Sequence, residues 1–258
     1  MRPEEDDSGG TPGPGWSGSP EEDGEWARLA SVVAEEAYDA PLEELPARLC
    51  ATAVRLLPVC GASVLLRGDG LPVRLGASDG TAARVADVQG TLGEGPGLDA
   101  AAAGAPVFAC DLARGADLGR WPVFAEQATG AGVRAVYSLP LGEGAACVGS
   151  LDLYRDTPGE PTGRDLRTGG LVAGVVTVAL MALPDEEWTV FGGGDSRLGR
   201  MTSEHEQIHQ ATGMIMAQLD LGAGDALARL RGYAFAHGRT AGAAAREVIA
   251  HRKRFDDE

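Results

Sequence analysis

Histidine is absent from the first 202 residues of this 258-residue chain, and lysine occurs only once, as Lys253. Without histidine, this long segment cannot assemble a Ser-His-Asp or Cys-His nucleophile pair, a histidine-ligated haem or the usual histidine-rich metal site. Paired carboxylates do not stand out either, because Asp111, Asp117 and Asp152 are as typical of loop caps as of catalysts. We therefore predict a protein that is not an enzyme and that holds no metal and no cofactor.

Paired cysteines and long apolar runs are also missing. No Cys-x-x-Cys pair occurs, which argues against a zinc ribbon or a redox motif and predicts small buried cysteines in a reducing compartment. The longest apolar run, residues 169–183, covers 15 residues, whereas a membrane-spanning helix needs about 20. The acidic N-terminal stretch lacks the apolar core of a signal peptide. We expect a cytoplasmic protein that makes no contact with a membrane.

Negative charge dominates the chain but not its C-terminal fifth. The formal net charge of −16 is untypical of a nucleic-acid-binding protein taken as a whole. Residues 203–254, however, hold seven Lys or Arg against five Asp or Glu, together with all four histidines. This segment has a net charge of +2, and the other 206 residues carry −18. We interpret the segment as an electrostatically separate unit.

Apolar periodicity predicts an α+β domain over residues 25–183, after an acidic tail of residues 1–24 that buries too little surface to become ordered. Alternating apolar residues predict five strands, at 62–68, 72–78, 105–112, 134–142 and 146–155. Helical spacing predicts helices at 25–57 with a break near Pro41, and at 97–103, 121–131 and 163–183. A GEGA turn joins the last two strands as a hairpin, so we predict an antiparallel sheet flanked by helices.

A second, all-helical unit is predicted at residues 203–254, after a glycine-rich linker at 184–202. Ser203 and Glu206 have the spacing of a capping box, which would start the first helix. Gly222 would end that helix, and the predicted caps of the next two helices are Asp225 and Thr240. Each helix has one apolar face, which predicts a bundle of three short helices.

The segments LGEGPGLDAAAAGAPVFACDL, WPVFAEQATGAGVRAVYSLPL and VGSLDLYR resemble a GAF domain in its compact actinobacterial form, over about residues 25–183. The resemblance implies a sensor fold that holds a small molecule between the sheet and a covering loop and helix, and that dimerises through its flanking helices. The cyclic-nucleotide signature and the bilin-site histidines of other family members are missing, so the ligand stays unidentified. The glycines at 93–97 lack the Lys-Ser/Thr of a phosphate loop and are interpreted as a turn entering a short helix.

The stretch IHQATGMIMAQLDLGAGDALARLRGYAFAHGRTAGAAAREVI, residues 208–249, resembles an ANTAR domain, the three-helix RNA-binding output module of transcription antiterminators. The resemblance implies a homodimer that binds paired stem-loops in nascent RNA, in the context of RNA polymerase, and prevents the terminator hairpin from forming. The chain departs from the family at Gly238, Ala241 and Ala244, where small residues imply a thin core.

RNA loops expose unstacked bases and phosphates, which arginine planes, amide side chains and aromatic rings can recognise. On this basis the candidate RNA-binding residues are Gln207, Gln210, Arg231, Tyr233, Arg239, Arg246, Arg252 and Lys253. An alternative without RNA stays open for these residues. The glutamines can belong to an ordinary exposed helix face, Tyr233 can be half-buried with a solvated hydroxyl, and the basic run at 251–254 can be a solvated helix end.

The main alternative is a DNA-binding helix-turn-helix at residues 225–250, coupled to the same GAF sensor. A recognition helix should present polar and basic side chains to the major groove. The segment from Thr240 onwards is rich in alanine and offers few such side chains at its start. The pattern therefore favours RNA over duplex DNA.

Overall fold

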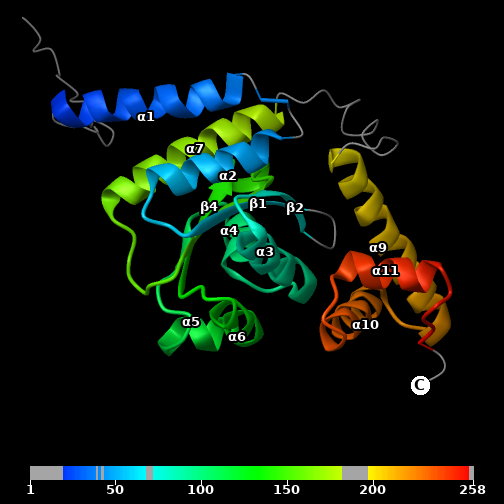
Figure 1. Cartoon of the computed structure of the whole chain (residues 1–258). Helices are drawn as coiled ribbons and strands as arrows, with labels where there is room; N and C mark the ends of the chain where they lie inside the picture. The colour runs from blue at the N-terminus through cyan, green and yellow to red at the C-terminus, as the bar shows by residue number, and fades with distance from the viewer. Residues whose placement is uncertain (1–19, 39, 42–43, 68–71, 182–196, 256–258) are drawn as a thin grey trace, which may run out of the picture.

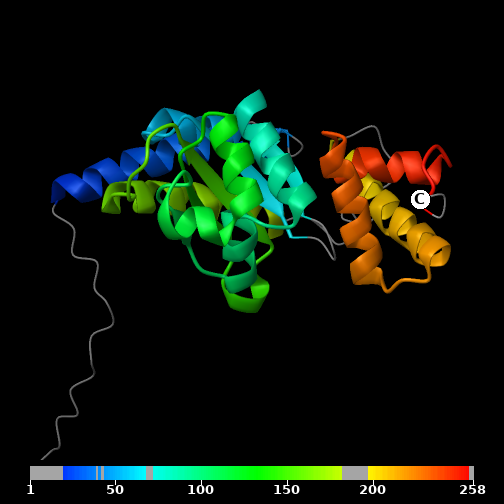
Figure 2. The same cartoon turned by 90° about the horizontal axis from the view of Figure 1, so that it is seen from below.

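The computed structural model describes residues 20–38, 40–41, 44–67, 72–181 and 197–255. An α+β domain comes first and a bundle of three helices follows beside it (Figures 1 and 2). The predicted tail and linker lie mostly outside the described residues. The structure nevertheless extends helix into both, because α1 begins at Pro20 and the first bundle helix begins at Arg197.

Five antiparallel strands form one sheet in the order β2-β1-β5-β4-β3. Their bounds are Gly61–Leu66 for β1, Val73–Ala77 for β2, Val107–Ala109 for β3, Ala135–Leu141 for β4 and Gly149–Arg155 for β5. The predicted antiparallel sheet and its five strands are confirmed, including the hairpin between β4 and β5. The central strand β5 is buried along most of its length, because helices cover both faces of the sheet.

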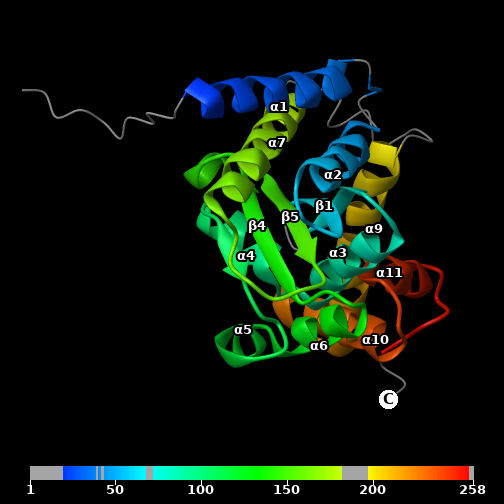
Figure 3. The same cartoon turned by 60° about the vertical axis from the view of Figure 1, so that its left-hand side comes forward.

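One face of the sheet is covered by α2 (Leu45–Leu56) and α7 (Gly163–Met181), and α1 (Pro20–Tyr38) packs on the outer side of these two helices, as Figure 3 shows. The predicted break near Pro41 separates α1 from α2. Apolar side chains of α2 and α7, among them Leu49 and Val172, pack on alternate residues of β4 and β5. These strand residues include Leu139, Leu151 and Leu153. This cluster is the main hydrophobic core.

The other face carries α3 (Gly80–Leu92), α4 (Pro96–Ala103), α5 (Gly115–Arg120) and α6 (Pro122–Gly130). The helices predicted at 97–103 and 121–131 are present as α4 and α6, but the prediction missed α3 and α5. The apolar positions of α3 are mainly alanine and valine among glycine and threonine, so its periodicity is weak. Its start is marked by Asp79, whose carboxylate accepts hydrogen bonds from the backbone nitrogens of Thr81 and Ala82, at 2.7 and 3.0 Å.

The C-terminal bundle consists of α9 (Arg197–Leu219), α10 (Ala223–Ala236) and α11 (Ala241–Ile249). Its core is thin, as predicted, because it is made largely of alanine around a few larger side chains, among them Ile208, Ile215, Leu230 and Phe255. The expected apolar faces meet in this core.

The predicted helix starts in this bundle are partly wrong. Helix α9 begins at Arg197, so Ser203 lies inside it; a Ser-x-x-Glu pattern marks a start only where the preceding residues do not continue the helix. Gly222, not Asp225, is the N-cap of α10. The cap at Thr240 is confirmed, because its hydroxyl accepts a hydrogen bond from the backbone nitrogen of Ala243 at 3.2 Å.

The cysteine prediction holds for Cys50 and Cys147, which are buried, but not for Cys60, which is exposed. All four are free thiols. Among the helices of the described ranges, none combines the length and apolar character needed to cross a membrane.

Candidate nucleic-acid interface

A groove of about 530 Å³ runs along α10 on the side where the chain returns after α11. Residues spaced one helical turn apart on α10 form its floor, and the C-terminal segment closes one side. Its lining includes Leu221, Asp225, Arg229, Tyr233, His237 and Phe255. The groove therefore combines aromatic surface with basic side chains.

Two rings and one ammonium group surround the Tyr233 ring. The ring centroids of Tyr233 and His237 lie 4.2 Å apart, and Phe255 meets Tyr233 edge-on at 5.6 Å. The Lys253 Nζ lies 5.3 Å from the Tyr233 ring and 5.0 Å from the Phe255 ring, within cation–π distance. Aromatic rings beside a cation form a surface on which a nucleobase can stack next to its phosphate.

Glu247 of α11 organises this cluster. Its Oε2 accepts a hydrogen bond from the Tyr233 hydroxyl at 3.0 Å, and its Oε1 pairs with the Arg239 guanidinium. The Glu247 side chain is 19% exposed, whereas that of Arg239 is 44% exposed. The carboxylate thus fixes Tyr233 and holds Arg239 at the surface beside it. We call Tyr233, Arg239, Glu247, Lys253 and Phe255 the Tyr233 cluster.

The structure brings together three of the predicted site residues, Tyr233, Arg239 and Lys253. Arg246 and Arg252 are exposed on α11 and just after it, and on α9 Gln210 is exposed and Gln207 half-buried. Sequence reasoning missed Glu247 and Phe255. Within residues 203–254, Glu247 is the one acidic residue after Asp225. This isolated negative charge among basic residues was the only feature of the sequence that could have indicated its role.

Arg231 lies apart from the other candidates. It is two residues from Tyr233, and two residues turn a helix by about 200°, so the two side chains leave opposite sides of α10. The Arg231 guanidinium packs against Gly93, where a Cβ atom would lie 2.6 Å from the Arg231 Cζ. Burial lowers the pKa of Arg231. Its predicted place among the RNA contacts is therefore not supported in this arrangement, since it faces the α+β domain.

A second contact joins the two domains next to Arg231. The backbone nitrogen of Ala241, at the start of α11, donates a hydrogen bond to the Thr91 hydroxyl at 3.4 Å. Thr91 and Gly93 both belong to the C-terminal end of α3, where helix carbonyls favour positive charge. The bundle thus contacts the α+β domain at the end of α3, and α9 contacts β2 as well.

The α+β domain contains a buried polar row beneath α3 and α4. Ser63 on β1 and Ser138 on β4 are both paired in register with Asp152 on β5, and all three are fully buried. The Gln89 side chain donates to the Asp152 Oδ2 at 2.6 Å and accepts from the backbone nitrogen of Gly97 at 2.9 Å. Gln89 therefore ties the sheet to the first turn of α4.

Of the two roles left open for Asp152, a loop cap is excluded, because Asp152 lies in the middle of the central strand. Burial raises the pKa of Asp152 to about 6. Burial also raises the pKa of Tyr154, whose hydroxyl shares a 2.7 Å hydrogen bond with Ser63. Asp117, in contrast, does cap a loop, accepting from the backbone nitrogens of residues 110 and 111.

The glycines at 93–97 form a turn into α4, as predicted. Gly95 has a φ of +145°, and a Cβ atom there would lie 2.3 Å from the Gln89 Oε1. At Gly97 a Cβ atom would lie 2.4 Å from the Asp152 Oδ2. The glycines let the α4 backbone approach the polar row closely. Within the described part of the chain, no three His, Cys, Asp or Glu side chains gather into a metal-holding group.

The GAF domain family model matches residues 39–181, and the ANTAR domain model matches residues 197–249. These two matches, on an α+β domain followed by a helical bundle, define a regulator that has a sensor domain and a helical output module. The first match covers more than half of the chain, which therefore belongs to the GAF domain family. No curated protein matches the chain significantly.

Solved structures with a similar fold include GAF domains and chromophore-binding domains. The GAF domain of a phosphoenolpyruvate-protein phosphotransferase from Coxiella burnetii is 15% identical, with a TM-score of 0.49, over 60% of this chain and 92% of that one. The chromophore-binding domain of a bacteriophytochrome from R. palustris is 13% identical, with a TM-score of 0.45, over 66% and 64%. The protein fRMsr of Staphylococcus aureus is 13% identical, with a TM-score of 0.45, over 60% and 94%.

Proposed function

We propose that this protein regulates transcription by binding stem-loops in nascent RNA through its ANTAR module, thereby preventing termination, under the control of its GAF domain. The observation that carries the proposal is the Tyr233 cluster with its groove. An aromatic ring held in place by a carboxylate, beside exposed arginines, suits a base that has left its stack and the phosphate next to it. The GAF domain would supply the signal, as the receptor of a small molecule.

Duplex DNA fits the same module less well. Helix α11 would have to act as the recognition helix, yet most of its residues are buried in the bundle. Of its two charged side chains, Glu247 is paired with Arg239, which leaves Arg246 as the basic group offered to a major groove. RNA loops do not require a recognition helix, because their unstacked bases are accessible to side chains without entry into a groove.

The proposed assembly is a homodimer, so that one molecule engages two stem-loops. Helices α1 and α7 lie together on the side of the sheet away from α3 and α4 (Figures 1 and 3). On α7, Val178 is 70% exposed and Met181, one turn further, is 53% exposed. Exposed apolar side chains on a flanking helix support an interface at this face.

The test is RNA binding by the full chain, measured by fluorescence anisotropy with a tandem stem-loop RNA over a range of salt concentrations. We expect salt-sensitive binding that Tyr233→Leu weakens by about five- to a hundredfold, the value of one stacked base. The matched control is Phe235→Leu, an exposed aromatic on α10 outside the groove, which should bind as the unchanged protein does.

Two outcomes would contradict the proposal. One is RNA binding that is absent or insensitive to salt, because phosphate contacts release counterions and must show a salt dependence. The other is a preference for duplex DNA when duplex and stem-loop compete at a fixed salt concentration, which would favour the helix-turn-helix instead.

A further inference from the structure

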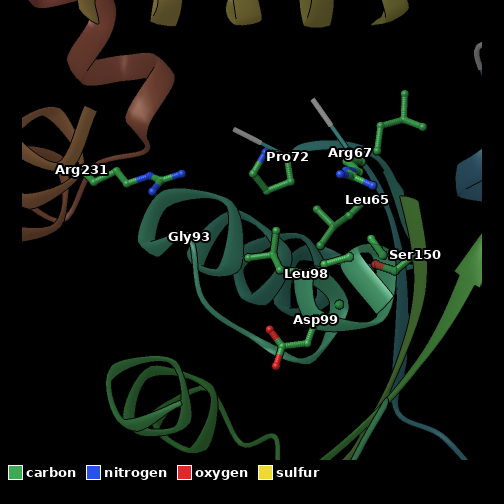
Figure 4. A pocket seen from close by; sticks show the side chains of 12 residues that line it. Leu65, Arg67, Pro72, Gly93, Leu98, Asp99, Ser150 and Arg231 are labelled. Atoms are coloured by element: carbon green, nitrogen blue, oxygen red, sulfur yellow. The ribbon is translucent and has the colours of Figure 1, made fainter. Parts of the chain in front are cut away.

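The bundle rests on the GAF domain at the end of α3, which comprises residues 89–93 (Figures 3 and 4). There the Thr91 hydroxyl accepts a hydrogen bond from the backbone nitrogen of Ala241, the first residue of α11, at 3.4 Å. Both residues are buried. Figure 4 shows Arg231 extending from α10 towards Gly93. Docking therefore covers the start of α11 and one arginine of the bundle.

The two domains nevertheless keep separate hydrophobic cores. Among the described residues, the bundle core consists of side chains from α9, α10, α11 and the segment after α11, and the cores of the GAF domain contain none of these side chains. A cavity of about 250 Å³ lies between the domains, with β2 and α3 on one side and Ile208, Thr240 and Gly242 on the other. Domain interiors contain few voids larger than a water molecule. Because motion between domains is expected unless their interface is large and hydrophobic, the bundle can separate from the GAF domain without unfolding.

The charges of the two domains make the docked arrangement unfavourable for RNA binding. Residues 25–181 hold 19 Asp or Glu against 12 Arg, a net charge of −7, whereas residues 203–254 carry +2. An acidic domain held against the bundle repels the phosphates of an approaching RNA, over a distance of about 8 Å at physiological salt. The same contact keeps Arg231 half-buried against α3. Separation of the domains would remove both obstacles.

We infer that the docked arrangement is an inhibited state, in which the end of α3 holds the bundle, keeps Arg231 away from RNA and places the acidic GAF domain against the module that carries the Tyr233 cluster. Release of the bundle from the end of α3 raises its affinity for RNA. The effect on RNA rests on the proposed function, whereas docking and release do not.

The end of α3 is also tied to the interior of the GAF domain. The Gln89 side chain donates a hydrogen bond to Asp152 on the central strand at 2.6 Å, and the Gln89 carbonyl accepts one from the backbone nitrogen of Gly93 at 2.9 Å. The last turn of α3 thus contacts the sheet through Gln89 and the bundle through Thr91. A shift of α3 on the sheet must move the surface on which the bundle docks, which gives the GAF domain control over release.

Docking is tested on the full chain without RNA, by hydrogen–deuterium exchange at the start of α11, residues 239–243. Thr91→Arg places a bulky cation in the buried contact, so we expect it to release the bundle and to accelerate exchange there by about tenfold or more. Thr81→Arg is the matched control, because it adds the same side chain at the exposed start of α3. Slow exchange along β5 shows that each variant is folded. Equal exchange at residues 239–243 in the two variants would refute docking through the end of α3.

Inhibition is tested by titrating the same two variants with the tandem stem-loop RNA at one salt concentration. We expect Thr91→Arg to bind RNA about five- to a hundredfold more tightly than Thr81→Arg, the usual range of coupling between two sites. The comparison cancels the added charge, since each variant gains one arginine. Faster exchange without tighter RNA binding would refute the inhibited state. RNA binding by neither variant would instead refute the proposed function, and the exchange measurement would still decide on docking.

Control by the GAF domain is tested with Gln89→Ala, which removes the bond to Asp152 and leaves Thr91 in place. We expect faster exchange at residues 239–243 and tighter RNA binding than in the matched control Gln127→Ala, at an exposed position of α6. Slow exchange along β5 again shows that the variants are folded. Exchange at residues 239–243 that is equal in Gln89→Ala and Gln127→Ala would refute control through α3.

Discussion

The Tyr233 hydroxyl donates a hydrogen bond to Glu247 at 3.0 Å, which joins α10 to α11 at the surface proposed to bind RNA. The same carboxylate pairs with Arg239. A negative charge thus occupies the centre of a basic surface, where it fixes a ring and partly neutralises a cation that would otherwise meet a phosphate.

Glu247→Gln separates these two roles, because glutamine keeps an acceptor for Tyr233 but removes the charge. We expect RNA affinity to rise by about two- to fivefold, because Glu247 no longer competes with an RNA phosphate for Arg239. This factor corresponds to the free energy of one exposed ion pair. The salt dependence should steepen by about one phosphate contact, as Arg239 becomes available. Anisotropy titrations at several salt concentrations measure both quantities.

The control for this variant is Glu206→Gln, which removes the same charge from an exposed position on α9. It should raise affinity less than Glu247→Gln does. A fall in affinity for Glu247→Gln would mean that its charge is needed to position Tyr233, contrary to the prediction.

Asp152 predicts a pH dependence of the sensor domain. Its pKa is raised from an ordinary 3.8 to about 6 by burial, so the folded state favours the neutral acid. The stability from this group is full below pH 3.8 and is lost as the pH rises towards 6, after which it stays constant. Between pH 5 and 7 the free energy of unfolding should fall by about 1 kcal/mol from this source.

Asp152→Asn isolates that contribution, because asparagine stays neutral and can still accept from Gln89. Urea unfolding of both proteins between pH 5 and 7 gives the difference in free energy. We expect the advantage of the asparagine variant to grow with pH. A constant difference across this interval would show that Asp152 titrates normally in the folded protein.

Gly97 is predicted to be the least replaceable glycine of the turn before α4. A Cβ atom there would lie 2.4 and 2.7 Å from the two Asp152 carboxylate oxygens, so Gly97→Ala must push α4 off the sheet. The expected loss is about 1–3 kcal/mol in the free energy of unfolding, as for other overpacked sites. Urea unfolding at pH 7 measures it.

Gly170→Ala is the matched control, since nothing lies within 4 Å of a Cβ atom at this exposed position of α7. Because alanine favours a helix over glycine, this variant should gain about 0.5–1 kcal/mol. Equal effects of the two substitutions would refute the packing argument for Gly97.

The proposed dimer predicts that Val178→Glu produces a monomer, because a charge in the middle of an apolar interface loses its hydration without gaining a partner. Size-exclusion chromatography with light scattering measures the mass of each protein, and an unchanged far-ultraviolet circular dichroism spectrum shows that the variant is folded. Glu35→Gln, at an exposed position of α1, should leave the mass unchanged. A dimeric Val178→Glu would place the interface elsewhere.

Local signals determined much of this protein. Alternating apolar residues identified all five strands, the break near Pro41 separated α1 from α2, and Thr240 marked the start of α11. Each of these depends on neighbours a few residues away, so it is visible in the chain alone. The charge imbalance likewise separated the C-terminal unit from the sensor domain.

Weak or misleading local signals explain the errors. Helix α3 is made of small residues whose stability comes from packing on β2 and α6, so its periodicity was not recognised. Helix α9 continues through a sequence that resembles a start. Local sequence patterns likewise did not reveal the candidate site, because Glu247 of α11 contacts Tyr233 of α10 and Arg239 between the two helices.

The sequence by itself therefore indicated the GAF family, the resemblance to an ANTAR domain, the sheet and the net positive charge of residues 203–254. Tertiary structure alone decided that Arg231 faces Gly93 of the sensor domain while Tyr233 faces the groove, and that Asp152 lies buried beneath α4. The physical reason is that helical and strand periods act over a few residues. The partners of a buried charge or of a guanidinium come instead from segments far apart in the chain, and only packing brings them together.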